Sequence, residues 1–238
     1  MDTAPAFRLD VVSDTICPWC WIGKRRLEAA LARLGDDLDL ELRWRPFELN
    51  PDMPPEGISR RDYRTGKFGS WERSLALDAE VARAGAGDGL EFRHARQERT
   101  PNTLASHALV RLAGIGAAHP ADPFPRDVQS RTVEALFAAY FTEGRDVGDA
   151  AELVRIGTAV GLDPGAAASA VADPAGLAAL HAEAQAHARG GIGGVPSVLL
   201  EGFLLFSGAQ SPAAIEAVLR EAAAHADVLA AREARLAA

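Results

Sequence analysis

The sequence predicts an α/β fold in which the two ends of the chain form one mixed sheet and a large helical insertion lies between them. Three observations carry this expectation. The first 45 or so residues follow a strand–helix–strand pattern, residues 197–225 follow a strand–strand–helix pattern, and the region between them is mainly helical. Strands bury one face against helices, so the two end segments are expected to share one core. We therefore expect a discontinuous α/β domain of residues 1–55 and 190–225, an insertion of residues 56–189 and a helical tail of residues 226–238.

The N-terminal segment contains the clearest patterns. Residues 7–13 alternate between apolar and polar side chains up to Val12, as in a strand with one buried face. Residues 18–34 carry an apolar stripe at helical spacing, and Gly35 follows as a helix C-cap. Residues 38–45 alternate strictly and are expected to form a second strand.

The middle of the chain reads as helices separated by turns. A turn-rich connector at residues 50–57 precedes them, and residues 90–92 carry the one weak strand pattern of this region. The expected helices span residues 70–84, 102–113, 125–142, 149–160, 164–172 and 174–189.

Strand patterns return after a glycine run at residues 190–194. That run precedes a strand rather than linking a strand to a helix, so it does not match a dinucleotide-binding loop. Residues 197–201 and 203–207 flank Gly202 and predict a tight hairpin. Ser211 and Pro212 then supply an N-cap and a first helical residue for a last helix.

The two cysteines of the chain, Cys17 and Cys20, enclose Pro18 and Trp19 at the junction of the first strand and the first helix. A zinc site of the usual kind needs four ligands, and there is no second cysteine pair to supply them. A C-x-x-C pair in a strand–helix–strand context instead predicts a thioredoxin-like redox motif. We therefore expect a thioredoxin-like fold.

The position of each cysteine predicts its role. Unpaired N–H groups and the helix dipole at a helix N-terminus stabilise an anion, so Cys17 is the candidate nucleophilic thiolate. Cys20 lies one turn further along the same face and is the candidate resolving thiol. Pro18 and Trp19 are candidate substrate contacts, Trp19 because an exposed indole beside the sulfurs could stack on a substrate.

Further motifs give the chain a family resemblance. Cys17-Pro18-Trp19-Cys20 after the first strand and Gly194-Val195-Pro196 before a later one resemble the DsbA family of thioredoxin-like proteins. Residues 45–51 (RPFELNP) and 102–107 (NTLASH) resemble its FrnE-like cytoplasmic branch, which is related to 2-hydroxychromene-2-carboxylate isomerases. The resemblance implies that Pro196 is cis and lies opposite the cysteines. It also implies that the backbone of Val195 meets an extended substrate.

Two other functions stay open at this stage. Glutathione-dependent isomerases among the relatives carry a hydroxyl nucleophile at the first motif position, whereas this chain has Cys17 there and Cys20 as well. In those relatives the segment matching residues 207–210 binds a glutathione carboxylate. A chaperone role that does not use the cysteines is the third reading. The roles of Asn102 and His107 stay open between substrate contact and structure, with Asn102 a candidate helix cap.

Charge and composition limit the partners. The net charge of −8 disfavours nucleic-acid binding, which needs a basic face. No signal-peptide pattern and no run of about 18 apolar residues is visible, so we expect a cytoplasmic protein with no membrane partner. The expected partner is a protein or small molecule that carries a thiol or disulfide. No cofactor or metal is expected, although glutathione could serve as redox partner or co-substrate. The oligomeric state is left open.

Overall fold

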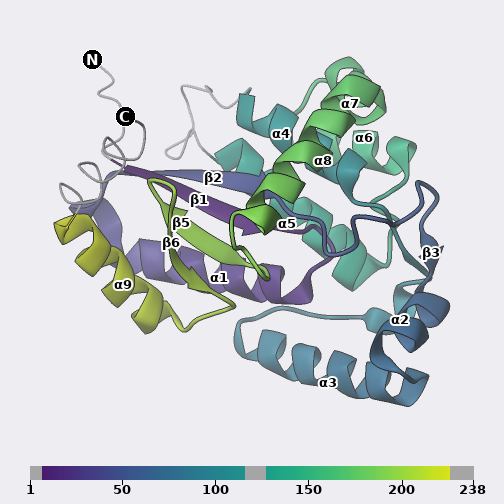
Figure 1. The fold of residues 1–238 in the computed structure, drawn as a ribbon, viewed down its shortest axis with the longest axis horizontal. Helices are drawn as coiled ribbons and strands as arrows, with labels where there is room; N and C mark the ends of the chain where they lie inside the picture. Colours follow the sequence, from purple (N-terminus) through teal and green to yellow (C-terminus); the bar gives the residue numbers. More distant parts are fainter. Residues whose placement is uncertain (1–6, 116–126, 226–238) are drawn as a thin grey trace.

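A four-stranded mixed sheet forms the centre of the computed structural model, which describes residues 7–115 and 127–225. The strand order is β2-β1-β5-β6 (Figure 1). Strand β1 (Phe7–Ser13) pairs in parallel with β2 (Leu40–Pro46) and antiparallel with β5 (Ser197–Leu200). Strand β6 (Phe203–Ser207) pairs antiparallel with β5. The two ends of the chain therefore share one sheet, and the predicted thioredoxin-like architecture is confirmed.

Local sequence signals explain most of these elements. Helix α1 (Pro18–Leu34) begins and ends at the predicted residues, and Gly35 closes it with a positive φ of 53°. The β5–β6 hairpin turns at Glu201 and Gly202, which both have positive φ. The N-cap Ser211 accepts a hydrogen bond from the backbone N–H of Ala214 at the start of α9 (Pro212–Ala224). Strand β2 begins two residues later than predicted.

The insertion is helical, as predicted, and lies toward one end of the sheet (Figure 1). Helices α1 and α9 pack against each other, while α4 and α8 contact β2. The helices of the insertion are α2 (Arg60–Phe68), α3 (Trp71–Gly87), α4 (Leu104–Ile115), α5 (Asp127–Ala138), α6 (Ala150–Ala159), α7 (Pro164–Ala172) and α8 (Pro174–Arg189).

The structure corrects the sequence reading of the insertion in three places. Helix α2 was not predicted, because its nine residues are mostly polar and include a glycine, so they show no apolar stripe. Residues 90–92 form no strand; the short strands are β3 (Ile58–Ser59) and β4 (Arg99–Thr100), which pair with each other. The predicted helix 125–142 changes after α5 into a π-helical turn, Ala139–Glu143. Two further predictions, the helix start at residues 125–126 and the helical tail 226–238, fall outside the described residues.

An aromatic cluster joins the insertion to α1. The Trp21 ring lies 5.1 Å from Phe92 and 5.9 Å from Phe141, measured between ring centroids, and Phe137 packs beside them. All four side chains belong to or pack on one hydrophobic core that also contains Leu9 and Val11 of β1. The insertion and the sheet therefore share a core. Within the described residues, no helix combines the length and apolarity needed to cross a bilayer.

Candidate functional site

Cys17 occupies the N-cap position of α1, and Pro18 is the first residue of the helix. The N–H of Cys17 donates to the carbonyl of Asp14 (3.0 Å), and the N–H of Cys20 donates to the carbonyl of Cys17 (3.0 Å). Both cysteines are free; Cys17 is 4% exposed and Cys20 is fully buried. The helix start thus holds one sulfur at the edge of a cavity and the other behind it.

The Val195–Pro196 peptide bond is cis, as predicted. The thiol of Cys17 donates to the carbonyl oxygen of Val195, with the sulfur 3.6 Å from it. On the neighbouring turn of α1, Gly23 lies so close to Pro196 that a Cβ there would sit 2.7 Å from the proline Cγ. Val195 and Pro196 therefore lie opposite the cysteine pair, as the family resemblance implied.

The buried position of Cys20 changes the acidity of its thiol. The pKa of Cys20 is raised well above its ordinary value, first by burial and then by its hydrogen bond to Cys17 and the charge of that neighbour. Cys20 therefore stays a thiol at neutral pH. Only a thiolate attacks sulfur, so Cys20 is held inactive until its surroundings change.

A buried carboxyl, Asp14, lies beneath the loop that carries Cys17. Its oxygens accept hydrogen bonds from the N–H groups of Ile16 (3.3 Å) and Leu49 (2.7 Å). Burial raises the pKa of Asp14 to about 6. The sequence reading assigned Asp14 no role; a carboxylate three residues before the first cysteine was the available signal.

His107 lies beside Asp14 in the core. Its Nε2 donates to the carbonyl of Phe47 (3.0 Å) and lies 3.9 Å from the Asp14 carboxylate. Burial lowers the pKa of His107 to about 4, so the ring is neutral at physiological pH. Of the two readings left open for His107, its position fits the structural one.

A cavity of about 360 Å³ opens beside Cys17. Cys17, Pro18, Trp19 and Val195 line one side of it, and Trp19 is 37% exposed there. The opposite wall comes from the insertion, mainly from α2 and α3, and includes Arg60, Tyr63, Arg64, Lys67 and Asp78. The sequence analysis missed the α2 part of this wall because it did not predict that helix.

Buried charges form part of that wall. Arg60 and Arg64 both contact the carboxylate of Asp78, at 2.8 Å each, and all three side chains are largely buried. His94 lies beside them, 4.0 Å from Asp78, and burial lowers its pKa. Two guanidinium groups thus share one carboxylate.

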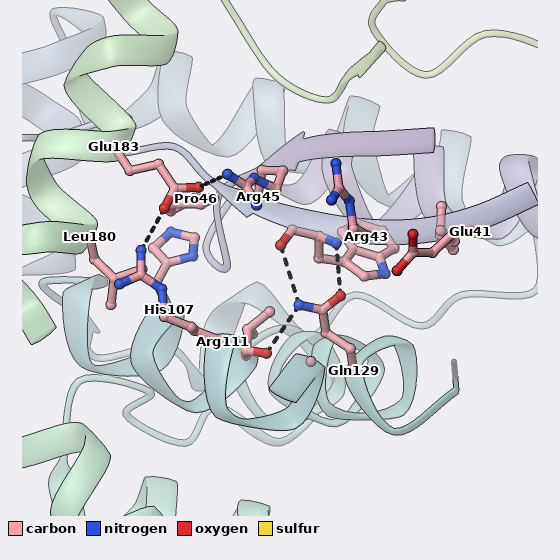
Figure 2. A pocket seen from close by; sticks show the side chains of 13 residues that line it. Glu41, Arg43, Arg45, Pro46, His107, Arg111, Gln129, Leu180 and Glu183 are labelled. Atoms are coloured by element: carbon pink, nitrogen blue, oxygen red, sulfur yellow. Dashed lines mark hydrogen bonds and ion pairs between the residues drawn. The ribbon is translucent and has the colours of Figure 1, made fainter. Parts of the chain in front are cut away.

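A second cavity, of about 240 Å³, lies between β2 and helices α4, α5 and α8 (Figure 2). Neither cysteine lines it. Two of its arginines, Arg45 (2.8 Å) and Arg111, pair with its Glu183. We therefore take the cavity beside Cys17 as the candidate active site.

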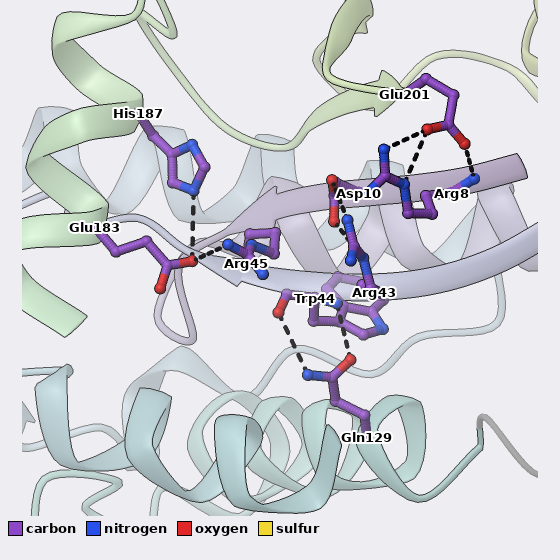
Figure 3. A network of polar contacts seen from close by, with 9 residues as sticks. All are labelled: Arg8, Asp10, Arg43, Trp44, Arg45, Gln129, Glu183, His187 and Glu201. Carbon is purple, nitrogen blue, oxygen red and sulfur yellow. Dashed lines mark hydrogen bonds and ion pairs between the residues drawn. The ribbon is translucent and has the colours of Figure 1, made fainter. Parts of the chain in front are cut away.

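The edge of the sheet near this second cavity is closed by side chains (Figure 3). The amide of Gln129 accepts from the N–H of Trp44 (2.9 Å) and donates to its carbonyl (3.4 Å), as a neighbouring strand would. Arg43 pairs with Asp10 across the β1–β2 register, through two contacts of 2.9 Å. The backbone of Trp44 and the side chain of Arg43 on this edge are therefore occupied by contacts within the protein.

Two remaining candidates have structural partners. Asn102 accepts from the N–H of Leu104 (3.0 Å) and donates to the carbonyl of Met53 (2.8 Å), so of the two roles left open for it, its contacts fit the structural one, at the start of α4. In the segment 207–210, Gln210 donates to the carbonyl of Ser207 (2.9 Å), and the hydroxyls of Ser207 and Ser197 lie 2.6 Å apart. The expected carboxylate contact of that segment stays a prediction.

A mixed sheet, a cysteine pair at the start of the following helix and a cis-proline opposite the first cysteine together define a thioredoxin-like protein. Residues 8–220 match the DSBA-like thioredoxin domain, and the chain belongs to that family.

The chain is also similar to a relative and to solved structures. The chain is 31% identical over 155 residues to the uncharacterized protein YwbO of Bacillus subtilis, a match covering 65% of this chain and 66%, just under two thirds, of that relative. A probable DsbA oxidoreductase from Streptomyces coelicolor has a TM-score of 0.77 at 29% identity, with 91% of this chain and 89% of that one covered. The cytosolic disulfide reductase DsbM of Pseudomonas aeruginosa, solved with GSH, has a TM-score of 0.59 at 19% identity, with coverage of 90% and 98%. A 2-hydroxychromene-2-carboxylate isomerase, with a TM-score of 0.58 at 15% identity and coverage of 96% and 98%, shares the fold.

Proposed function

We propose that the chain is a thiol–disulfide oxidoreductase in which Cys17 is the nucleophile and Cys20 the resolving thiol. The observation that carries the proposal is the asymmetry of the pair. Cys17 lies at the helix start beside a cavity, whereas Cys20 is buried behind it with a raised pKa. Dithiol chemistry needs one sulfur that attacks first and one that waits.

The reaction proceeds in two exchanges. The Cys17 thiolate attacks one sulfur of a substrate disulfide; that S–S bond breaks, one substrate thiolate leaves, and a mixed disulfide forms. Cys20 then loses its proton and attacks the Cys17 sulfur, which releases the second substrate thiolate and leaves a Cys17–Cys20 disulfide. Two electrons pass from the protein to the substrate, and a cellular thiol reductant restores the pair. The reverse sequence oxidises a dithiol substrate.

The predicted substrate contacts fit this scheme. The Val195 carbonyl lies within 3.6 Å of the Cys17 sulfur, so a substrate bonded to that sulfur would meet the backbone before Pro196. An extended substrate could pair with this backbone as an added strand does. Trp19 would cover the leaving sulfur from the side, and Pro18 would fix the first turn of the helix that carries both cysteines.

The alternative is a glutathione-dependent isomerase. Its support is the fold shared with 2-hydroxychromene-2-carboxylate isomerase and the GSH named for the DsbM structure. At 15% and 19% identity, these two structures show a shared fold and nothing further. The thiol pair at Cys17 and Cys20 favours redox chemistry over a single-nucleophile isomerisation.

One equilibrium experiment separates the two functions. The protein is incubated across a series of reduced-to-oxidised glutathione ratios, free thiols are alkylated, and the mass is read. We expect a two-electron transition to an intramolecular Cys17–Cys20 disulfide. A midpoint of about −270 mV would indicate a disulfide reductant. A midpoint between about −180 and −120 mV would indicate a disulfide isomerase or an oxidant. If the cysteines never pair and glutathione is held as a stable adduct or a tight complex, the result favours the glutathione-dependent isomerase.

The location of this chemistry stays a prediction. A cytoplasmic site would give the pair a reducing thiol pool to work against. Fractionation of cells that produce the chain, followed by immunodetection, checks it.

A further inference from the structure

We infer that Lys67 selects small disulfides that carry a carboxylate, by binding that carboxylate at the mouth of the cavity beside Cys17. This inference rests on the proposed disulfide exchange and concerns which disulfides undergo it.

Access to the nucleophile favours small substrates. Cys17 is only 4% exposed and borders a cavity of about 360 Å³ whose far wall is formed by α2 and α3. Cavities of this size are typical of small-molecule sites. A small disulfide can enter such a space, and this favours small substrates over a disulfide held in a folded protein.

The charge of the cavity differs from that of the chain. The protein carries a net charge of −8, yet three cations line the cavity against two carboxylates, Asp78 and Glu80. Two of the cations, Arg60 and Arg64, are already bound to Asp78. The third, Lys67, is exposed and is therefore the cation that a ligand would meet.

Lys67 is held in place by neutral groups. Its ammonium donates to Asn50 Oδ1 (3.1 Å) and to the hydroxyl of Tyr63 (2.6 Å), and it lies 5.2 Å from the centre of the Tyr63 ring. Within residues 7–115 and 127–225, no carboxylate lies within ion-pair distance of this ammonium. These contacts orient the charge without neutralising it, so a substrate carboxylate supplies the missing partner.

The test compares three disulfides that differ in charge: 3,3′-dithiodipropionate (two negative), 2-hydroxyethyl disulfide (neutral) and cystamine (two positive). The second-order rate constant of the reduced protein is measured with each disulfide. The rate constant of each variant is then divided by that of wild type for the same disulfide, which cancels the intrinsic reactivity of the disulfide. For Lys67→Met we expect a fall of about two- to fivefold with dithiodipropionate, the range of an exposed ion pair. The neutral disulfide should be unaffected and cystamine should react faster. Lys67→Arg should retain most of the wild-type rate.

Arg61→Met is the matched control. Arg61 is exposed on the same helix and lies over the Trp71 ring, and it does not line the cavity. The variant loses the same charge, so it should react like wild type with all three disulfides. Equal slowing of all three by Lys67→Met would show a structural role, and the same charge discrimination in Arg61→Met would show a long-range field. Either result overturns the inference.

A binding readout keeps this inference separate from the proposed function. The chain has two lysines, and the other, Lys24, is buried against Glu28 and Glu134. Acetylation of Lys67 by an amine reagent can therefore be followed in a Cys17→Ser protein, where no exchange occurs, by the mass of the peptide that contains Lys67 after digestion, which separates it from acetylation of the α-amine. Dithiodipropionate should slow this acetylation and 2-hydroxyethyl disulfide should not; equal rates would overturn the inference. If wild type reduces none of the disulfides while protection is seen, the proposed reaction fails and the anion site stands.

Discussion

Asp14 and His107 lie 3.9 Å apart beneath the cysteine loop, and burial shifts their pKa values in opposite directions. The pKa of Asp14 is raised from 3.8 to about 6, so between these values the folded protein holds a proton that the unfolded chain has lost. This makes stability fall as the pH rises through that window. The pKa of His107 is lowered from 6.5 to about 4, so the unfolded chain is the more protonated state and stability rises with pH. The two effects oppose each other near pH 5.

Replacing either residue should make the effect of the other on the pH dependence of stability measurable. For His107→Gln, which keeps a donor for the Phe47 carbonyl, we expect the free energy of unfolding relative to wild type to fall by about 2–3 kcal/mol between pH 4 and 6. For Asp14→Asn, the same difference should rise with pH by a similar amount. Urea unfolding at half-unit steps of pH measures both. Difference curves of the same sign, or two flat curves, would show that the groups do not titrate as a buried pair.

The cysteines should also be separable by substitution. In Cys20→Ser the mixed disulfide of Cys17 with a substrate thiol has no resolving partner, so it should accumulate and be visible as an added mass. In Cys17→Ser the buried Cys20 thiol, whose pKa is raised, should form little adduct under the same conditions. Mass spectrometry after incubation with oxidised glutathione checks both variants. Faster adduct formation at Cys20 than at Cys17 would reverse the assigned roles.

At the scale of the elements, α1 connects the cysteines to the cis-proline loop. Gly23 faces Pro196, and a Cβ there would approach the ring to 2.7 Å. Gly23→Ala should therefore push the loop away from Cys17. Overpacking costs about 1–3 kcal/mol, which exceeds or matches the roughly 1 kcal/mol that alanine gains in a helix. We expect slower disulfide exchange together with a loss of up to about 2 kcal/mol, measured by exchange kinetics and urea unfolding.

Gly66→Ala provides the comparison on α2. An added Cβ there meets nothing within 4 Å, so this variant should be neutral or slightly stabilising. Exchange slowed equally by both variants would mean that the contact between Gly23 and Pro196 does not position the site.

These elements also show how far the sequence alone could go. Helix α1, the β5–β6 hairpin and the capped α9 were predicted because short-range signals define them: an apolar stripe, Gly202 at a turn, and Ser211-Pro212 at a helix start. The cysteine pair and cis-Pro196 followed from motif and resemblance. Helix α2 was missed although Ser59 and Gly69 cap it, because its polar residues show no apolar stripe and its packing includes tertiary contacts such as that of Arg60 with Asp78. The α2 part of the far wall of the cavity was missed for the same reason.

At the scale of the whole molecule, the sheet and the insertion are held together by shared packing. Trp21 of α1 stacks on Phe141, which follows α5, and Phe92 packs edge-on against both rings. Phe141 is 2% exposed and belongs to the core that also contains β1. The insertion is therefore expected to unfold with the sheet and not as a separate unit.

Phe141→Ala tests this coupling. Truncating a buried phenylalanine lowers the free energy of unfolding by about 3–5 kcal/mol, and both the sheet and the insertion should show this loss. Native-state hydrogen exchange should show the slowest amides of β1 and of α6 losing protection by the same free energy, because both exchange through one global opening. The exposed Leu75→Ala on α3 is the control and should leave both sets unchanged. If the α6 amides lost protection while the β1 amides kept it, the insertion would be an independent folding unit, and the wall of the cavity beside Cys17 could open without disturbing the cysteine pair.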